Sequence, residues 1–370
     1  MSGSRRLKLL LSGDVMTGRG VDQALPHSCP PRLYEPVVTS ALDYVALAER
    51  ANGPIRRPVD HAYVWGDALA VLEEERPEAR IVNLETSITT SDEPDPKGIN
   101  YRMHPGNAPV LTAAKIDCCA VANNHVLDWG RAGLGETLET LARAGIRSAG
   151  AGPDLRAAEA PAVLAVGTES RVLVFAFGAT DAGIPDDWGA GPAAAGVHLL
   201  PDFSGRTVER IAGLVRATKR PGDVAVASVH WGANWGYDIP TAHRRFAHGL
   251  IERAGVDAVH GHSSHHPKAI EVYRERPILY GCGDLLNDYE GIPGKEEFRD
   301  DLVLLYFVTF EIPAGRLVRL TLTPLRIRNF RLNHPSAGER AWLRERLDRE
   351  CRRFRHRVIA ADDAFAVEWA

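Results

Sequence analysis

Four histidines fall within seven residues in the stretch Val259-His260-Gly261-His262-Ser263-Ser264-His265-His266-Pro267, directly after an apolar run typical of a buried strand. Imidazole nitrogen is a common ligand for transition metals, and a strand end holds such a ligand rigidly. A polar surface loop that happens to be rich in histidine is the alternative explanation. The pattern indicates metal or phosphate chemistry at this point of the chain.

Four other polar clusters also follow apolar runs. They are Gly13-Asp14-Val15-Met16, Asn83-Leu84-Glu85-Thr86, Ala122-Asn123-Asn124-His125 and Val229-His230-Trp231-Gly232. Each has a structural explanation when taken alone, such as a helix cap or a buried, satisfied histidine. Ligands of α/β proteins collect at the carboxyl ends of strands, so these clusters are expected to share one rim. The side chains expected there are Asp14, Glu85, Asn124, His125, His230, His262 and His265.

The chemical types in this set predict a site for two divalent metal ions. Aspartate and glutamate supply anionic oxygen, and one carboxylate can bridge two cations. Asparagine supplies a neutral oxygen and histidine a nitrogen, a mixture that favours Mn, Fe or Zn over Ca or Mg. Two such ions about 3.5–4 Å apart can clamp a phosphate group and activate a water molecule.

The elements that must position these clusters alternate between strands and helices. The apolar runs before the clusters predict strands at residues 7–11, 79–84, 118–122, 224–229 and 255–259, and a hairpin is predicted around Pro313-Ala314-Gly315. This alternation is typical of an α/β protein with an antiparallel portion near its C-terminus. We expect one domain over residues 1–330 and a C-terminal helical appendage over residues 331–370, with a helix from Ala337 to Arg357.

Composition narrows the range of partners and locations. The formal net charge of −4 gives no electrostatic reason to bind nucleic acid, and the apolar runs are too short for a membrane span or a secretion signal. The cysteines (Cys29, Cys118, Cys119, Cys282 and Cys351) include no CxxC pair, and neighbouring Cys118 and Cys119 would point to opposite faces of a strand. We therefore expect reduced, buried thiols and a cytoplasmic protein, and no redox role for the adjacent pair.

In order along the chain, the five clusters and the Gly283-Asp284 turn resemble the CapA family of bacterial capsule or poly-γ-glutamate synthesis proteins. This family is related to calcineurin-like metallophosphoesterases, and the resemblance runs from about Leu9 to Asn287. It implies a four-layer αββα sandwich of two mixed sheets with helices outside, and a binuclear metal site.

Transferred by position, the resemblance also implies roles for individual residues. Asp14, Glu85, Asn124, His230 and His265 would be metal ligands, with Glu85 as the bridge, and His262 either a ligand or a support for one. His125 would be the general acid or a phosphate contact. Two departures stand out: Met16 replaces a histidine common in the superfamily, so one metal is expected to have fewer ligands. Capsule-associated members also usually carry an N-terminal membrane anchor; none is seen here, which favours a soluble enzyme.

These observations predict a metal-dependent hydrolase that acts on a phosphate ester or a related small anionic substrate. Arg102, in Tyr101-Arg102-Met103-His104, is a candidate anion clamp because guanidinium binds carboxylate or phosphate in bidentate fashion, and Lys268 is a candidate for a similar part. Two alternatives stay open, both suggested by the family. One is an amide-bond enzyme acting on a glutamyl polymer or similar γ-glutamyl substrate, and the other is a non-catalytic accessory protein of polymer synthesis.

Overall fold

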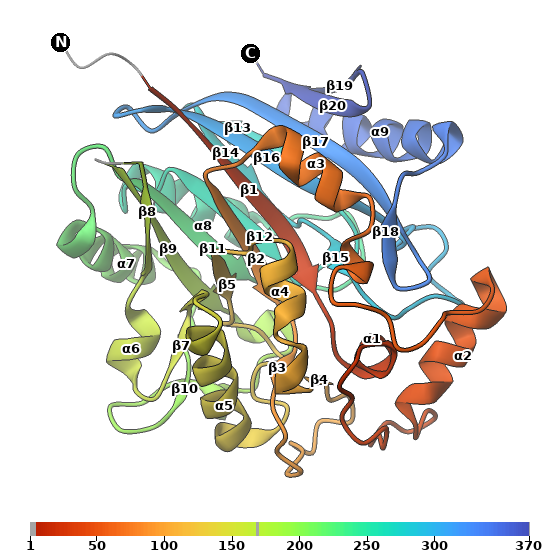
Figure 1. Ribbon diagram of the computed structural model, residues 1–370. Coiled ribbons are helices and arrows are strands. Elements are labelled where there is room, and N and C mark those ends of the chain that lie inside the picture. Colours follow the sequence, from red (N-terminus) through yellow and green to blue (C-terminus); the bar gives the residue numbers. More distant parts are fainter. Residues whose placement is uncertain (1–4, 168–169, 370) are drawn as a thin grey trace.

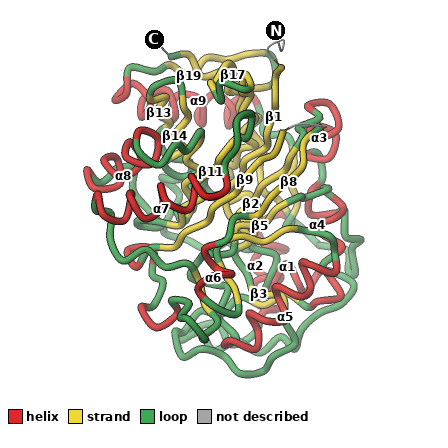
Figure 2. The backbone as a smooth tube through the Cα atoms, turned by 90° about the vertical axis from the view of Figure 1, so that its left-hand side faces the viewer, coloured by secondary structure: helices red, strands yellow, loops and turns green. Residues whose placement is uncertain are grey.

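The computed structural model describes residues 5–167 and 170–369 and contains two mixed β-sheets packed face to face, with helices on the outer faces. Figures 1 and 2 show this layered arrangement from two directions, with α7 and α8 on one side and α3 and α4 on the other. The predicted four-layer αββα sandwich is thereby confirmed.

The larger sheet contains the first three of the predicted strands. Its order is β19 (Arg357–Ala361), β20 (Ala364–Glu368), β17 (Arg316–Arg328), β16 (Leu302–Ile312), β1 (Arg5–Val15), β2 (Ala79–Leu84), β5 (Cys118–Ala120) and β6 (Arg147–Ala149). Strands β1, β2, β5 and β6 run parallel to one another. The pairs β1–β16, β16–β17, β17–β20 and β20–β19 are antiparallel. Two short strands extend this sheet: β15 (Asp284–Leu286) pairs with the end of β1, and β18 (Arg331–Asn333) pairs with β17.

The smaller sheet carries the two histidine-bearing strands. Its order is β13 (Ile270–Tyr273), β14 (Arg276–Leu279), β12 (Ala258–His262), β11 (Val224–His230), β9 (Ser170–Gly178) and β8 (Ala162–Val166). The four central strands are parallel, so β11 and β12 end on the same edge. Two two-stranded pieces lie apart from both sheets: β3 (Ser87–Ile88) with β4 (Arg102–Met103), and β7 (Ala151–Gly152) with β10 (Gly196–Val197).

Alternate side chains of β9 show how both faces of the smaller sheet are covered. Val172, Val174 and Ala176 belong to the large core that also contains the strands of the other sheet. The intervening residues belong to a second core beneath α7 (Gly205–Thr218) and α8 (Thr241–Glu252); they are Leu173, Phe175 and Phe177. Because successive side chains of a strand point to opposite faces, this strand is apolar on both and must be covered on both.

The remaining helices include three, α3, α4 and α5, that pack on the larger sheet. Their bounds are α1 (Arg19–Ala24), α2 (Ala41–Asn52), α3 (Ala68–Glu75), α4 (Pro109–Ala113), α5 (Gly130–Arg143), α6 (Leu155–Glu159) and α9 (Ala337–Cys351). Short 3-10 turns occur at Tyr63–Trp65, Pro105–Asn107, Thr180–Ala182, Asp186–Trp188 and Arg352–Phe354. Buried Leu72 of α3, Leu111 of α4 and Leu134 of α5 join the large core, which fixes these helices to the sheet.

The C-terminal segment differs from the helical appendage that we expected. Helix α9 begins with a capping box between Ser336 and Glu339 but ends at Cys351, and Arg355 then adopts a left-handed φ of 64°. The chain continues as the hairpin β19–β20, which adds to the larger sheet through β17. The alternation of buried Val358, Phe365 and Val367 explains these strands, because it matches one face of a sheet. A domain boundary at residue 330 stays a prediction.

The cysteines and the helix lengths relate to the expectations of reduced, buried thiols and of no membrane span. All five cysteines are buried and free, and Cys118 and Cys119 lie next to each other on β5. In the described part of the chain, every helix is too short or too polar to span a bilayer.

Candidate metal centre

The ends of strands from both sheets meet at one point between the sheets. Asp14 ends β1 beside Asp284 of β15, and Gly13 allows this approach, since a Cβ there would lie 1.5 Å from the carbonyl oxygen of Gly283. From the smaller sheet, His230 and His262 end β11 and β12 directly opposite each other. The predicted convergence of the strand ends is therefore present in the fold.

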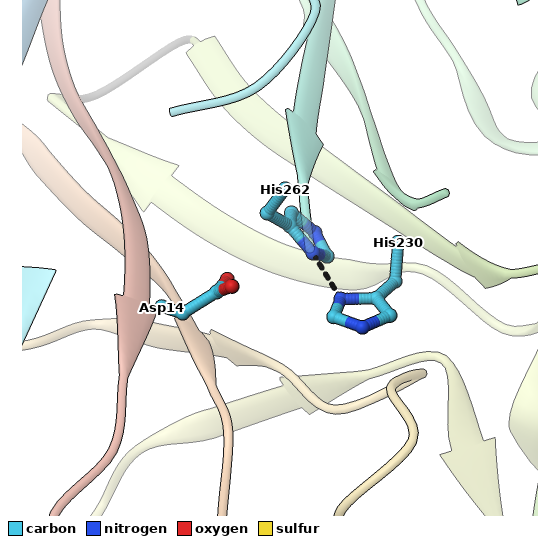
Figure 3. A group of neighbouring side chains, drawn as sticks. All are labelled: Asp14, His230 and His262. Atoms are coloured by element: carbon cyan, nitrogen blue, oxygen red, sulfur yellow. Dashed lines mark hydrogen bonds between the residues drawn. The ribbon is translucent and has the colours of Figure 1, made fainter. Parts of the chain in front are cut away.

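Two groups of potential ligands share the carboxylate of Asp14. One consists of Asp14, His230 and His262 (Figure 3), and the other of Asp14, His265 and Asp284. In each group the potential ligand atoms lie within 4.8 Å of one another, and all five residues are buried. A shared carboxylate between two donor sets is the arrangement expected of a bridging ligand.

Glu85, the bridge implied by the resemblance, lies beside this shared carboxylate. The Nδ2 of Asn83 donates to Oδ1 of Asp14 over 2.8 Å and to Oε2 of Glu85 over 2.7 Å. Oε2 of Glu85 is 3.7 Å from Nδ1 of His230, whereas Oδ1 of Asn124 is 3.0 Å from the Nε2 of that ring. The geometry places Glu85 and Asn124 at the His230 side of the centre and makes Asp14 the carboxylate that both groups share.

Burial dominates the electrostatics of the centre. It raises the pKa of Asp14 to about 7, with the charge of Asp284 adding to the effect, and it raises the pKa of Glu85 well above its usual value. Burial also lowers the pKa of His230 and of His262, so both rings are neutral at physiological pH. Burial acts against the charged form of His265 too, but the adjacent Asp284 outweighs it and the pKa rises.

The donor atoms of the centre can be compared with the ligands that a divalent cation requires. The neutral rings of His230 and His262 face each other through their Nδ1 atoms at 2.9 Å, so at least one lone pair points at the other nitrogen. Three carboxylates, those of Asp14, Glu85 and Asp284, are buried together, and His265, whose pKa is raised, supplies a counter-charge beside Asp284. A cation satisfies both conditions, because it accepts nitrogen lone pairs and neutralises buried carboxylates. The residues therefore fit a metal.

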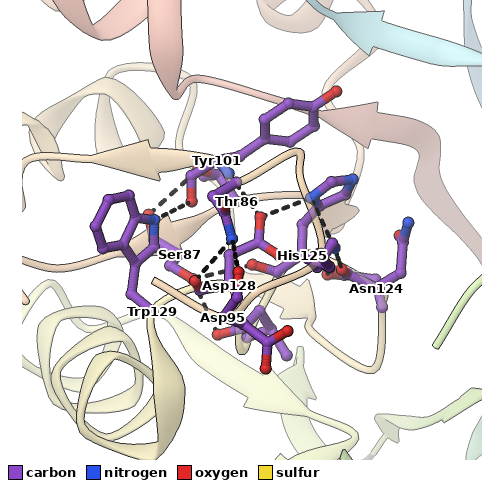
Figure 4. Close-up of polar contacts among 12 residues, drawn as sticks. Thr86, Ser87, Asp95, Tyr101, Asn124, His125, Asp128 and Trp129 are labelled. Atoms are coloured by element: carbon purple, nitrogen blue, oxygen red, sulfur yellow. Dashed lines mark hydrogen bonds and ion pairs between the residues drawn. The ribbon is translucent and has the colours of Figure 1, made fainter. Parts of the chain in front are cut away.

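His125 lies next to the centre in a polar network of its own (Figure 4). Its ring stacks on Tyr101 with centroids 3.9 Å apart, and its Nδ1 is 2.7 Å from Oδ2 of Asp128. The Nζ of Lys97 is 2.7 Å from the other oxygen of Asp128 and 3.4 Å from the His125 ring. Burial and the charge of Lys97 lower the pKa of His125 to about 4. The neutral ring thus carries its proton on Nδ1, toward Asp128, and presents a bare Nε2.

A cavity of about 440 Å³ opens beside these groups. Its lining includes three residues of the predicted site, which are Asn124, His125 and His265. Cationic and aromatic side chains supply much of the remaining wall: Arg19, Tyr44, Lys97, Tyr101, Trp235, Tyr289 and Lys295. The cavity therefore combines lysine and arginine side chains, the carboxyl group of Asp300 and flat aromatic surface beside the metal centre.

Arg19 is the most constrained of the cations around the cavity. Its guanidinium pairs with Asp288 over 2.5 Å and with Glu35 over 2.8 Å, and it lies 3.8 Å above the ring of Tyr44 and 4.6 Å from that of Tyr101. Its charge is already matched by two carboxylates. We infer that it fixes the aromatic wall of the cavity.

The two predicted anion contacts lie elsewhere. Arg102 donates to the carbonyl of Ser91 over 2.5 Å, pairs with Asp92 over 2.9 Å and stacks on Trp129, so its guanidinium is committed to a loop. Lys268 is buried with its Nζ 3.3 Å from the carbonyl of Ala233. Among the described residues that line the cavity, neither appears. Their roles as substrate contacts stay predictions.

Three residues that contribute to the site were not predicted. Asp284 belongs to the Gly283-Asp284 turn of the motif series but is not among the predicted metal ligands. A carboxylate directly after the glycine of a motif is the sequence signal that could have identified it. Lys97 lies in a polar, proline-containing loop, and Asp128 follows the Asn-His pair by three residues. Neither of these two stands out from ordinary loop residues in sequence.

Comparison with known proteins identifies the family of this chain. Residues 8–289 match the family described as bacterial capsule synthesis protein PGA_cap. A probable polyglutamine synthesis accessory protein of Mycobacterium tuberculosis is 50% identical over 357 residues, covering 96% of this chain and 94% of its own. The PGA biosynthesis protein CapA of Bacillus subtilis is 24% identical over 317 residues, covering 85% of this chain and 70% of its own.

A solved phosphatase structure from Mycoplasma pneumoniae aligns with 88% of this chain and 95% of its own, at 10% identity and a TM-score of 0.45. The family match covers most of the chain and includes every strand end of the centre. The chain belongs to the bacterial capsule synthesis protein family PGA_cap, as the order of its motifs predicts.

Proposed function

We propose that this protein is a metal-dependent hydrolase with a binuclear centre that acts on an anionic substrate, most simply a phosphate ester. The observation that supports the proposal is the pair of ligand groups that share Asp14 beside the cavity. Asp14, His230 and His262 would hold one ion, with Asn124 and Glu85 beside it. His265 and Asp284 would hold the second together with Asp14.

The mixture of oxygen and nitrogen donors favours Mn, Fe or Zn in this centre. When bound, two such ions supply a water molecule of lowered pKa and polarise the substrate. The protein residues do the remaining work. Lys97, which pairs with Asp128 at the wall of the cavity, would contact an anionic group of the substrate, and Tyr101 and Asp128 hold the ring of His125 in one orientation.

Proton transfer by His125 requires an anion in the cavity. The neutral ring has its proton on Nδ1, whereas donation to a leaving group needs a proton on Nε2 as well. A bound anion raises the pKa of a neighbouring imidazole, so the second proton would be taken up as the substrate binds. The Nε2 of His125 would then pass that proton to the departing oxygen or nitrogen.

A glutamyl polymer is a second candidate substrate. The name of the Mycobacterium tuberculosis relative refers to polyglutamine synthesis, and the lysines of the cavity match carboxylates as well as phosphates. The chemistry would then be cleavage or transfer at an amide bond. The same name includes the word accessory, which is compatible with a non-catalytic role in polymer synthesis. We retain the cytoplasm as the proposed location, because the thiols are free.

Metal analysis of three variants tests the centre. Wild-type protein reconstituted with Mn²⁺ is expected to hold two ions, His265→Gln one and Asp14→Asn none. Asp92→Asn, whose side chain is 81% exposed, is the matched control and should hold two. Equal metal content in Asp14→Asn and wild type would overturn the proposal.

Turnover distinguishes the candidate functions. p-Nitrophenyl phosphates and γ-glutamyl peptides are offered to the manganese-loaded protein, with chelated protein as the control. Hydrolysis of the phosphates supports the main proposal, and cleavage of the peptides supports the second. Bound metal that raises the melting temperature without turnover of either class would support the accessory role.

A further inference from the structure

A chain of hydrogen bonds runs behind the metal centre and involves two residues with no assigned role. Ser228 lies directly opposite His260 in the β11–β12 pairing, and His230 lies opposite His262 two pairs further along. Residues two apart on a strand face the same side, so all four side chains point into the space between the sheets. Each is at most 1% exposed to solvent.

The chain begins at a backbone carbonyl of the other sheet. The Nε2 of His260 lies 2.7 Å from the carbonyl oxygen of Ser12 in β1. A carbonyl oxygen only accepts hydrogen bonds, so the Nε2 of His260 must carry a hydrogen. The polar contacts of His260 in the described part of the chain are this carbonyl and the hydroxyl of Ser228, and neither is an anion. A buried imidazole without an anionic partner is neutral, so its Nδ1 is an acceptor.

The hydroxyl of Ser228 in turn determines which ring nitrogen of His262 carries a hydrogen. The Oγ of Ser228 is 3.1 Å from Nδ1 of His260 and 2.8 Å from Nε2 of His262. A hydroxyl has one hydrogen to donate, and His260 takes it. The oxygen of Ser228 must therefore accept from His262, which places the hydrogen of that ring on Nε2. The Nδ1 of His262 is left bare, and it faces His230 in the ligand group that includes Asp14 (Figure 3).

We propose that Ser228 and His260 are positioning residues that fix the tautomer of His262 and so present its Nδ1 as a metal ligand. This inference rests on the proposed metal centre. Histidine ligands commonly have their second nitrogen held by a polar partner, which sets the tautomer and the ring orientation. Here the partner is a serine that is itself oriented by a second histidine. The alternative is that these bonds only satisfy buried polar groups.

A substitution in the middle of the chain separates these explanations. Ser228→Ala removes the acceptor of the His262 hydrogen and frees that ring to change tautomer, whereas Ser228→Thr keeps the hydroxyl. Ser12→Ala is the matched control, since the hydroxyl of Ser12 is buried without a partner among the described residues, while its carbonyl remains. Affinity for Mn²⁺ is measured by titration, and folding is checked by the melting temperature of the metal-free proteins.

We expect Ser228→Ala to bind one of the two ions about 10- to 100-fold more weakly than wild type, with Ser228→Thr and Ser12→Ala within about threefold of wild type. Equal affinity in Ser228→Ala and Ser12→Ala would overturn the positioning role.

A second measurement needs no variant at Ser228. Nitrogen-15 NMR of histidine-labelled, metal-free wild type reports which nitrogen of each ring carries hydrogen, with signals assigned through His260→Gln and His262→Gln. A hydrogen on Nε2 of His262 supports the inference, and a hydrogen on its Nδ1 overturns it. If wild type binds no metal, the proposed function fails, while this spectrum still decides the tautomer that Ser228 imposes.

Discussion

Replacing Asp14 with asparagine should stabilise the metal-free protein while it abolishes metal binding. Burial raises the pKa of Asp14 from 3.8 to about 7 in the folded chain. The folded state therefore binds a proton more tightly than the unfolded state does, and stability is lost as pH rises through this interval. Each pKa unit corresponds to about 1.4 kcal/mol, so the ionised carboxylate costs the metal-free fold about 4 kcal/mol at pH 8.

Asparagine has no charge to bury, but it is not a perfect replacement. The Oδ1 of Asp14 accepts from Asn83, and its Oδ2 accepts from the backbone N–H of Ser263 over 3.3 Å. An amide can accept at one of these positions only, and the lost bond costs about 1 kcal/mol. The net expectation is a gain of about 3 kcal/mol at pH 8. At pH 5 the penalty in wild type falls to about 2 kcal/mol, so the gain should shrink to about 1 kcal/mol.

Urea unfolding in EDTA at pH 8 and pH 5 measures this difference, with Asp186→Asn, at an exposed position, as the control that should match wild type. Adding Mn²⁺ should reverse the order, because an ion that binds only the folded state stabilises wild type and not Asp14→Asn. An Asp14→Asn protein that is less stable than wild type at both pH values in EDTA would refute the reasoning. So would an equal stabilisation of both proteins by manganese.

Three further predictions concern the cavity. Asp128→Asn should lower kcat about 10²-fold or more with unchanged metal content, since it releases Nδ1 of His125; steady-state kinetics and metal analysis check this. Lys97→Met should raise KM for an anionic substrate about tenfold, as expected for a charge that contacts the substrate directly, and a KM measurement tests it. Arg19→Met should destabilise the fold by about 3–5 kcal/mol in urea unfolding, because it leaves Asp288 buried without its partner.

Each of these has an outcome that would contradict it. Normal turnover in Asp128→Asn would remove the proton-transfer role of the network, and an unchanged KM in Lys97→Met would place the anion elsewhere. The comparison for Arg19 is Lys115→Met, which breaks an ion pair that is 70% exposed on both sides and should cost less than about 1 kcal/mol. Equal losses in the two variants would show that burial of the Arg19 pair is unimportant.

The parts of the fold that could be predicted are those with local signals. Runs of apolar residues that end in polar motifs mark strands such as β1, β11 and β12, and parallel strands bring such ends to one edge. The convergence of Asp14, His230 and His262 followed from that rule together with the family resemblance. The hairpin β19–β20 was missed because the charged sequence before it continues the helical pattern of α9 beyond Cys351.

The details of the site depend on contacts that local patterns do not encode. Asp14 belongs to both groups because β15 pairs with β1 so that Asp284 lies directly opposite Asp14, and whether Glu85 bridges two ions stays a prediction. Lys97 reaches the cavity from a loop whose path is set by tertiary contacts. Arg102, only five residues later, turns away to Asp92 and Trp129. The chemical roles of the individual ligands stay predictions.

The most direct test of the binuclear centre is an anomalous difference map from crystals grown with Mn²⁺. A binuclear centre should give two peaks on either side of the Asp14 carboxylate, one next to His230 and His262 and the other next to His265 and Asp284. Manganese at another position, or no peak beside Asp14 in protein that has retained its fold, would contradict it.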